Sequence, residues 1–268
     1  MSVDYYPLVT VITPCRNSVA YIEQTILSVI NQTYRNVEFI IVDGGSTDGT
    51  LDIVKKYEKS IQCTISEPDE GMYQAINKGL RRATGDIIAY LNSDDLYYPE
   101  TLAKVVHCFY LHSAADLIYG KLDFINHASC RIFTLSYPTF NPKYFPLVNY
   151  CMIGQPASFW RASLLARVGA FDETLKMASD FDFYIRAGRC GKLLFLSDTL
   201  AAFRIHGGSL TQTQNERAQA EVDIINSRYC DGSPSIIRFV RSRIYQGYFK
   251  VINVKAMLSK MMMRIGAV

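Results

Sequence analysis

Between residues 8 and 91, short apolar runs rich in β-branched residues alternate with segments of helical periodicity. The runs cover 8–13, 37–42, 63–66 and 87–91, and the helical segments cover 19–30, 46–57 including cap residues, and 72–83. Continuous apolar runs of this kind are typical of strands buried in a parallel sheet. Because the connections are short, the order predicts an α/β fold: a Rossmann-like, mostly parallel sheet with helices on both faces.

Every predicted strand is followed by polar residues. In chain order these are Thr13-Pro14-Cys15-Arg16-Asn17, Asp43, Glu67-Pro68-Asp69 and Asn92-Ser93-Asp94-Asp95. The carboxyl ends of parallel strands lie at one edge of a sheet, where open α/β folds bind ligands, so this pattern predicts a nucleotide site. The glycines spell neither G-x-G-x-x-G nor a P-loop, which argues against a dinucleotide fold and an NTPase.

The adjacent carboxylates Asp94 and Asp95 allow two interpretations. Two carboxylates held this close repel each other unless a cation lies between them. Oxygen ligands suit Mg²⁺ or Mn²⁺, which often bridge a protein carboxylate to a phosphate. The alternative is a solvated turn in which Asp95 caps the next helix, with Pro99 near its start.

Composition limits the class of protein. Of 268 residues, 49% are hydrophobic and 20% are charged, as in globular proteins. The seven cysteines are scattered without a C-x-x-C pair, which disfavours a disulfide scaffold or a zinc site and fits a reducing cytosol. The amino terminus lacks the pattern of a signal peptide, and no run of about twenty apolar residues predicts a membrane span. We therefore expect a cytoplasmic protein.

The second half has a looser pattern and shows no internal repeat. The sequence predicts a hairpin, a loop rich in proline and aromatic residues that lines a substrate pocket, a strand, a helix and two final strands. The hairpin covers 117–124 and 131–135, and the loop covers 137–146. The strand covers 153–160, the helix 179–189, and the final strands 193–196 and 200–205.

The carboxyl-terminal region 211–268 is predicted to be a helical, basic, amphipathic extension. Residues 233–268 contain seven basic residues and no acidic one, and subtracting these charges from the net +3 leaves −4 for residues 1–232. Such a segment can lie on an anionic membrane, pack on the body or make a contact in a homo-oligomer. Nucleic-acid binding is disfavoured, because the body is acidic and no recognised module is present.

Six segments carry a further signal by their order and spacing. They are Val11-Ile12-Thr13-Pro14, residues 42–50 (VDGGSTDGT), residues 67–73 (EPDEGMY), Asn92-Ser93-Asp94-Asp95, Ser179-Asp180-Phe181-Asp182 and Arg204-Ile205-His206. Together they resemble the motifs of family 2 glycosyltransferases of the GT-A fold, over roughly residues 7–210. The nearest subgroup is bacterial enzymes that build surface polysaccharides such as lipopolysaccharide and capsule.

The resemblance implies a GT-A domain over 1–210, with a nucleotide-sugar half (about 1–98) and an acceptor half (about 99–210). It implies an inverting hexosyl- or N-acetylhexosaminyltransferase that uses a UDP-sugar donor and Mn²⁺ or Mg²⁺. The acceptor would be a hydroxyl of a glycan or lipid-linked saccharide. The enzyme would work in the cytoplasm or on the inner face of the bacterial plasma membrane.

The resemblance also implies residue roles. Asp180 would be the general base, and the metal ligands would come from Asp94, Asp95 and His206. Base, ribose and diphosphate would contact Thr13, Pro14, Arg16, Asn17, Asp43, Ser46, Asp69 and Asp94. Weaker candidates for the diphosphate or the acceptor are Arg204, Gln155 and Asp182.

Two positions depart from the family pattern. Asn92 stands where the metal motif often has Asp, so Asp94 and Asp95 both stay candidates. Ser179 stands where the base motif often has Glu, so Asp182 is a second candidate base, although two residues along a helix it faces elsewhere.

Two other functions compete with glycosyl transfer. A nucleotidyltransferase would need a glycine-rich basic loop near its first strand, where only Arg16 is present. A catalytically silent nucleotide-sugar sensor or scaffold would need no base, so Asp180 argues against it.

Overall fold

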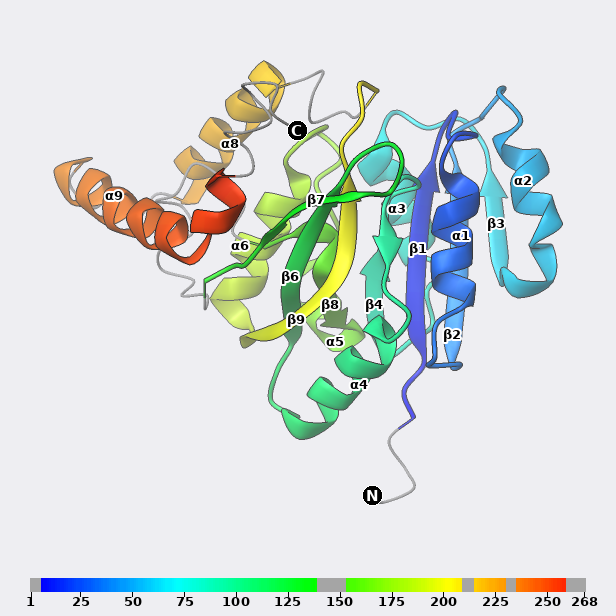
Figure 1. The fold of residues 1–268 in the computed structure, drawn as a ribbon, viewed down its shortest axis with the longest axis horizontal. Helices are drawn as coiled ribbons and strands as arrows, with labels where there is room; N and C mark the ends of the chain where they lie inside the picture. Colours follow the sequence, from blue (N-terminus) through cyan, green and yellow to red (C-terminus); the bar gives the residue numbers. More distant parts are fainter. Residues whose placement is uncertain (1–5, 139–152, 209–214, 230–234, 259–268) are drawn as a thin grey trace.

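The computed structural model describes residues 6–138, 153–208, 215–229 and 235–258. Its strands form one sheet in the order β3-β2-β1-β4-β8-β6-β9-β5, and β7 pairs with β6. The first half is parallel and consists of β1 (Val9–Cys15), β2 (Val37–Asp43), β3 (Cys63–Ser66) and β4 (Ile87–Tyr90). Figure 1 shows helices on both faces, with α1 (Ile22–Ile30) in front of β1 and α3 (Met72–Leu80) behind it.

The second half of the sheet is mixed. β8 (Ser158–Arg161) runs antiparallel to β4 and to β6 (Leu117–Ile125), whereas β9 (Leu193–Arg204) is parallel to β6. β7 (Arg131–Leu135) forms the predicted hairpin with β6, and the short β5 (Leu96–Tyr97) pairs with β9. The helices are α2 (Thr50–Lys56), α4 (Thr101–Leu111), α5 (Ala162–Val168) and α6 (Ser179–Cys190).

A continuous apolar core holds this sheet in place. Every residue of β1 is buried, which agrees with its mostly apolar, β-branched sequence. A β-carbon at Gly79 on α3 would lie 2.5 Å from Ile12, so the glycine lets the helix approach the strand closely. Trp160 packs edge-on against Phe171, as expected for core aromatic residues. The strand ends therefore rest on a rigid support.

Several boundaries differ from the sequence prediction. The predicted strand 153–160 begins instead as a 3₁₀ turn at Gln155–Ala157 and becomes β8 only at Ser158, because Pro156 has no N–H for a ladder. The two predicted final strands are one strand, β9, whose register against β6 shifts near Gly120. Helix α3 ends at Leu80, earlier than predicted. Of the predicted loop 137–146, residues 139–146 lie outside the described residues.

Two carboxyl-terminal helices, α8 (Asn215–Tyr229) and α9 (Ser235–Ile252), lie at the end of the molecule away from β3 (Figure 1). Ile225 of α8 is fully buried against the body. Beyond α9, the Asn253 side chain forms hydrogen bonds with both the N–H and the carbonyl of Ser136. Among the described helices, none has both the length and the apolar composition needed to cross a bilayer.

Candidate functional site

Asp43, at the end of β2, organises the first part of the strand-end edge. Its buried carboxylate accepts hydrogen bonds from the Ser66 hydroxyl at 2.8 Å and from the N–H groups of Gly45 and Ser46 at 3.1 Å. Burial alone would raise the pKa of Asp43, but these hydrogen bonds outweigh it and lower the pKa below its ordinary value. These hydrogen bonds orient Asp43 within the turn after β2, and its expected contact with the nucleotide stays a prediction.

Hydrogen bonds between side chains and backbone N–H groups join the loop after β1 to the loop after β2. Asn17, at φ 50°, accepts a hydrogen bond from the Thr47 N–H, and its own N–H donates to the Ser46 hydroxyl at 2.8 Å. The Ser18 and Ser93 hydroxyls are 2.8 Å apart, which links the first loop to the acidic turn after β4. Asn17 and Ser46 thus join the first two loops, and Ser18 and Ser93 join the first loop to the acidic turn.

Asp69 and Gly44 face each other across the same edge. A β-carbon on Gly44 would overlap the Asp69 carboxylate, whose Cγ would lie only 2.9 Å away. Asp69 Oδ1 accepts a hydrogen bond from the Gly71 N–H at 3.0 Å, and Gly71 has φ 143°, which favours glycine. Asp69 is half-buried, so it is the strand-end carboxylate best placed to meet a base or ribose.

The two neighbouring carboxylates after β4 have different environments. Asp95 is fully buried, and its Oδ1 accepts a hydrogen bond from the Arg204 N–H at 2.9 Å. Burial, and then the nearby charge of Asp94, raise the pKa of Asp95 well above its ordinary range. Asp94 is only half-buried, and its Oδ2 lies 2.9 Å from His206 Nε2. Of the two candidate metal ligands, only Asp94 is partly accessible to solvent.

Arg204, at the end of β9, packs against the acidic turn that follows β4. Its side chain is fully buried, and the guanidinium donates to the carbonyl of Asp94 at 2.8 Å and to Gln24 of α1 at 2.8 Å. It also donates to the carbonyl of Asn126 at 3.2 Å and to the Ser129 hydroxyl in the β6–β7 turn. Arg204 therefore holds the acidic turn in position, and its expected contact with the diphosphate stays a prediction.

Asp94 and His206 fit a divalent cation. Asp94 Oδ2 and His206 Nε2 lie at a hydrogen-bond distance of 2.9 Å, and this separation is also close to the roughly 3.0 Å between neighbouring ligands of an octahedral ion bound at about 2.1 Å. Tyr21 contacts the His206 ring, with centroids 4.8 Å apart, and restricts its orientation. In the part of the chain that the structure describes, no set of three or more His, Cys, Asp or Glu side chains converges, so these two residues form a partial site.

Asp180 lies in the first turn of α6. Its Oδ1 accepts hydrogen bonds from the Phe181 N–H at 2.8 Å and from the Tyr73 hydroxyl at 3.1 Å. Burial raises the pKa of Asp180 to about 6, against the lowering effect of these two bonds. A carboxylate whose pKa approaches neutrality is suited to general base chemistry.

Glu221 of α8 supports this region and was missed by the sequence reasoning. Its buried carboxylate accepts hydrogen bonds from three consecutive N–H groups, those of Lys176, Met177 and Ala178, at 2.7–3.0 Å. These residues lead directly into α6, so Glu221 fixes the approach to Asp180. The only sequence signal was Arg217, one helical turn earlier, which pairs with it.

The other candidates are placed as follows. Asp182 is buried and binds Arg186 and the Tyr229 hydroxyl, so it ties α8 to α6 and faces away from the position of a base. Gln155 is buried and donates to the carbonyl of Tyr90 at the end of β4. Both side chains have partners within the protein, and their expected contacts with the acceptor or diphosphate stay predictions.

At the end of β1, Thr13 and Pro14 are buried, whereas Arg16 is exposed. Thr13 Oγ1 makes no hydrogen bond within the described residues. Of these three residues, Arg16 alone presents its side chain to solvent beside the linked loops.

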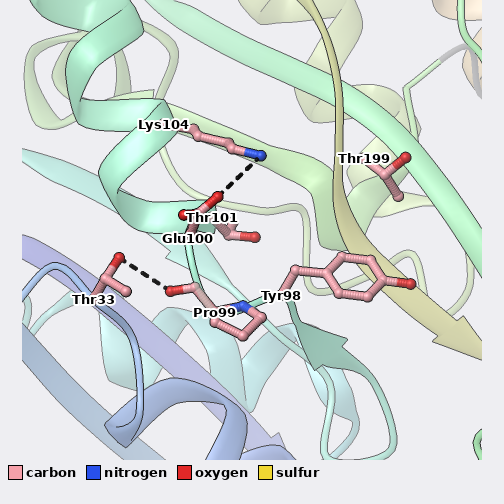
Figure 2. Close-up of a pocket in the computed structure, with 7 residues that line it drawn as sticks. All are labelled: Thr33, Tyr98, Pro99, Glu100, Thr101, Lys104 and Thr199. Atoms are coloured by element: carbon pink, nitrogen blue, oxygen red, sulfur yellow. Dashed lines mark hydrogen bonds and ion pairs between the residues drawn. The ribbon is translucent and has the colours of Figure 1, made fainter.

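A separate hollow of about 390 Å³ lies where α4 begins (Figure 2). Its charged lining residues, Glu100 and Lys104, pair with each other at 3.5 Å. Thr33 closes one side through a hydrogen bond to the carbonyl of Pro99. None of its lining residues belongs to the strand-end set, so this hollow is not the candidate site.

Comparison with solved structures supports the fold. The TarS 1–349 structure of S. aureus in complex with UDP-GlcNAc matches with a TM-score of 0.67 at 21% identity, covering 92% of this chain and 73% of that one. The mannosyltransferase PcManGT of Pyrobaculum calidifontis, in complex with GDP-Man and Mn²⁺, matches with a TM-score of 0.64 at 19% identity, covering 96% and 73%. The chain spans 42% of a longer TarS structure. The architecture is therefore that of GT-A glycosyltransferases.

Sequence comparison identifies the family. An uncharacterized glycosyltransferase of Rickettsia prowazekii is 28% identical over 227 residues, covering 82% of this chain and 71% of the relative. A PGL/p-HBAD biosynthesis glycosyltransferase of Mycobacterium tuberculosis is 32% identical over 186 residues, covering 67% and 69%. The family described as glycosyl transferase family 2 matches residues 10–161, more than half of the chain. This glycosyltransferase thus belongs to glycosyltransferase family 2.

Proposed function

We propose that this glycosyltransferase moves a sugar from a UDP-sugar to a hydroxyl of a glycan or lipid-linked saccharide, with inversion and with a divalent cation. The proposal rests on Asp180, a half-buried carboxylate in the first turn of α6 that the Phe181 N–H and the Tyr73 hydroxyl hold in place, and burial raises its pKa to about 6. The UDP-GlcNAc bound in the TarS structure supports this donor class, and the mycobacterial relative is named a PGL/p-HBAD biosynthesis glycosyltransferase. We place the reaction in bacterial surface polysaccharide synthesis.

In this mechanism one displacement at the anomeric carbon suffices. The acceptor hydroxyl oxygen forms the new bond to that carbon while the bond to the diphosphate oxygen breaks, and its electron pair leaves with the diphosphate. The hydroxyl proton passes to Asp180 Oδ2, because Oδ1 is held by the Phe181 N–H and the Tyr73 hydroxyl. A single inverting step needs no protein nucleophile, so one positioned base is enough.

The donor is held at the opposite part of the edge. Asp69 accepts a hydrogen bond from the base or ribose beside Gly44, and exposed Arg16 lies near the negative diphosphate. Asp94 and His206 would hold Mn²⁺ or Mg²⁺, with diphosphate oxygens and water as further ligands. The bound ion would neutralise the charge that develops on the leaving nucleoside diphosphate. Asp95 and Arg204 keep the acidic turn that contains Asp94 in place.

The Asp180→Asn variant tests the proposal. We expect it to bind UDP with unchanged affinity in calorimetry and to lose about 10²–10⁴-fold in the rate of UDP-sugar consumption, because it no longer accepts a proton. Asp52→Asn, an exposed acidic residue of α2, is the matched control and should keep full activity. Unchanged turnover in Asp180→Asn would remove this residue from the role.

The same calorimetry with UDP, GDP, dTDP and CDP, each with Mn²⁺ or with EDTA, tests the donor class. We expect UDP to bind best and to require the ion. If GDP bound more tightly than UDP, the donor would be a different nucleotide-sugar. If none of these nucleotides bound to the folded chain, the scaffold function would be favoured.

A further inference from the structure

The helix α9 carries an exposed apolar surface that the proposed catalytic chemistry does not use. Val240, Ile244, Tyr248 and Val251 have exposed fractions of 48%, 67%, 51% and 71%. At 3.6 residues per turn they lie within an arc of about 80°, so they form one stripe along the helix. Soluble proteins rarely leave a continuous apolar stripe in water, and such a stripe marks a binding surface.

The body occupies the other face of α9, so this stripe points away from the body. Phe249, about 180° around the helix from Val240, contacts the Tyr137 ring at a centroid distance of 6.4 Å. Just beyond the helix, Asn253 and Ala256 are buried. The side of α9 that packs on the body is therefore already defined, and the apolar stripe is on the side that remains.

The charged residues around the stripe indicate what kind of surface it binds. Residues 235–258 contain five basic residues and no acidic one. Arg243 and Lys250 are exposed and flank the stripe on one side, and Lys255 is exposed just beyond the end of α9. An apolar stripe bordered only by positive charge fits a surface that is negative outside and apolar beneath, which is the headgroup layer of an anionic bilayer. A second copy of α9 would instead place like charges face to face.

We propose that α9 is a docking helix that lies in the surface of an anionic phospholipid bilayer, with the stripe formed by Val240, Ile244, Tyr248 and Val251 inserted between the headgroups. The helix lies beside the acceptor half of the molecule, which contains β6 and β7 (Figure 1). Docking there would hold the enzyme where a lipid-linked saccharide is presented. This last point rests on the proposed function, whereas the binding of the bilayer itself does not.

Flotation of the full chain with vesicles tests this proposal. We expect the chain to float with vesicles that contain phosphatidylglycerol, to float less with pure phosphatidylcholine, and to be released by high salt. The double variant Ile244→Glu with Val251→Glu should weaken partitioning at least tenfold, and Arg243→Glu with Lys250→Glu should remove the preference for anionic lipid. Leu111→Glu, an exposed apolar residue of α4, is the matched control and should float like the unmodified chain.

UDP binding by each variant is measured in parallel, so that the two proposals fail separately. Absence of flotation with intact UDP binding would overturn the docking helix alone, and the reverse result would overturn the proposed function alone. Equal flotation of the Ile244→Glu, Val251→Glu variant and the unmodified chain would also refute the docking surface. A dimer that dissociates on Ile244→Glu, without any flotation, would replace the bilayer by a second copy of the chain.

Discussion

Single residues determine the chemistry of the site, and the Asp180 carboxylate controls its dependence on pH. A general base acts only when deprotonated, and burial raises the pKa of Asp180 to about 6. We therefore expect kcat to fall as the pH is lowered through about 6, whereas an unperturbed aspartate would lose its activity roughly two pH units lower. The check is a profile of kcat against pH at saturating donor and metal. An acidic limb that persists in Asp180→Asn would show that another group titrates.

Gly44 determines whether Asp69 can reach the nucleotide. A β-carbon at position 44 would overlap the Asp69 carboxylate, so Gly44→Ala has to displace that side chain. We expect about a tenfold higher Kd for UDP, comparable with Asp69→Ala, and little change in turnover at saturating donor. Gly247→Ala, where nothing lies within 4 Å of the added carbon, is the control and should bind normally. Equal UDP affinity in Gly44→Ala would exclude Asp69 from the nucleotide site.

At the scale of elements, α8 supports the catalytic turn through Glu221. In Glu221→Gln one of the three N–H groups before α6 loses its acceptor and faces an amide donor instead, so kcat should fall. The negative charge of Glu221 also contributes to the raised pKa of Asp180, so its removal should move the acidic limb of the kcat profile to lower pH. Glu216→Gln, exposed on the same helix, is the control. A fall in stability with an unmoved acidic limb would leave Glu221 a purely structural residue.

The elements also show which parts of the fold a sequence pattern can predict. The parallel half follows from the sequence, because its strands are short segments rich in apolar and β-branched residues and each is followed by polar residues. Arg204 shows the opposite case. Its partners include backbone carbonyls at Asp94 and Asn126, which no side-chain pattern marks, so its burial became visible only in the folded chain. Motif order predicted the candidate residues, whereas the difference between half-buried Asp94 and fully buried Asp95 became visible only in the tertiary structure.

For the whole molecule, the linked loops couple ligand binding to stability. Asn17, Ser46, Ser18 and Ser93 join the loops after β1, β2 and β4, so a nucleotide and a metal at this edge would bind only the folded chain. A ligand at one hundred times its Kd raises the free energy of unfolding by about 2.7 kcal/mol, which is roughly 5–10 °C in Tm for a chain of this size. We expect UDP with Mn²⁺ to produce such a shift in differential scanning fluorimetry, and UDP with EDTA a much smaller one.

His206→Ala separates the metal from the nucleotide in that experiment. The variant loses the partner of Asp94, so the additional shift caused by Mn²⁺ should largely disappear while the smaller shift with UDP and EDTA stays. His107→Ala, exposed on α4, is the matched control and should keep the full metal-dependent shift. If the ion raised Tm equally in His206→Ala and in the unmodified chain, the pair formed by Asp94 and His206 would not be the cation site. If the metal-dependent shift in Tm were lost only in His206→Ala, the ion would bind at the acidic turn that the Arg204 side chain holds in position.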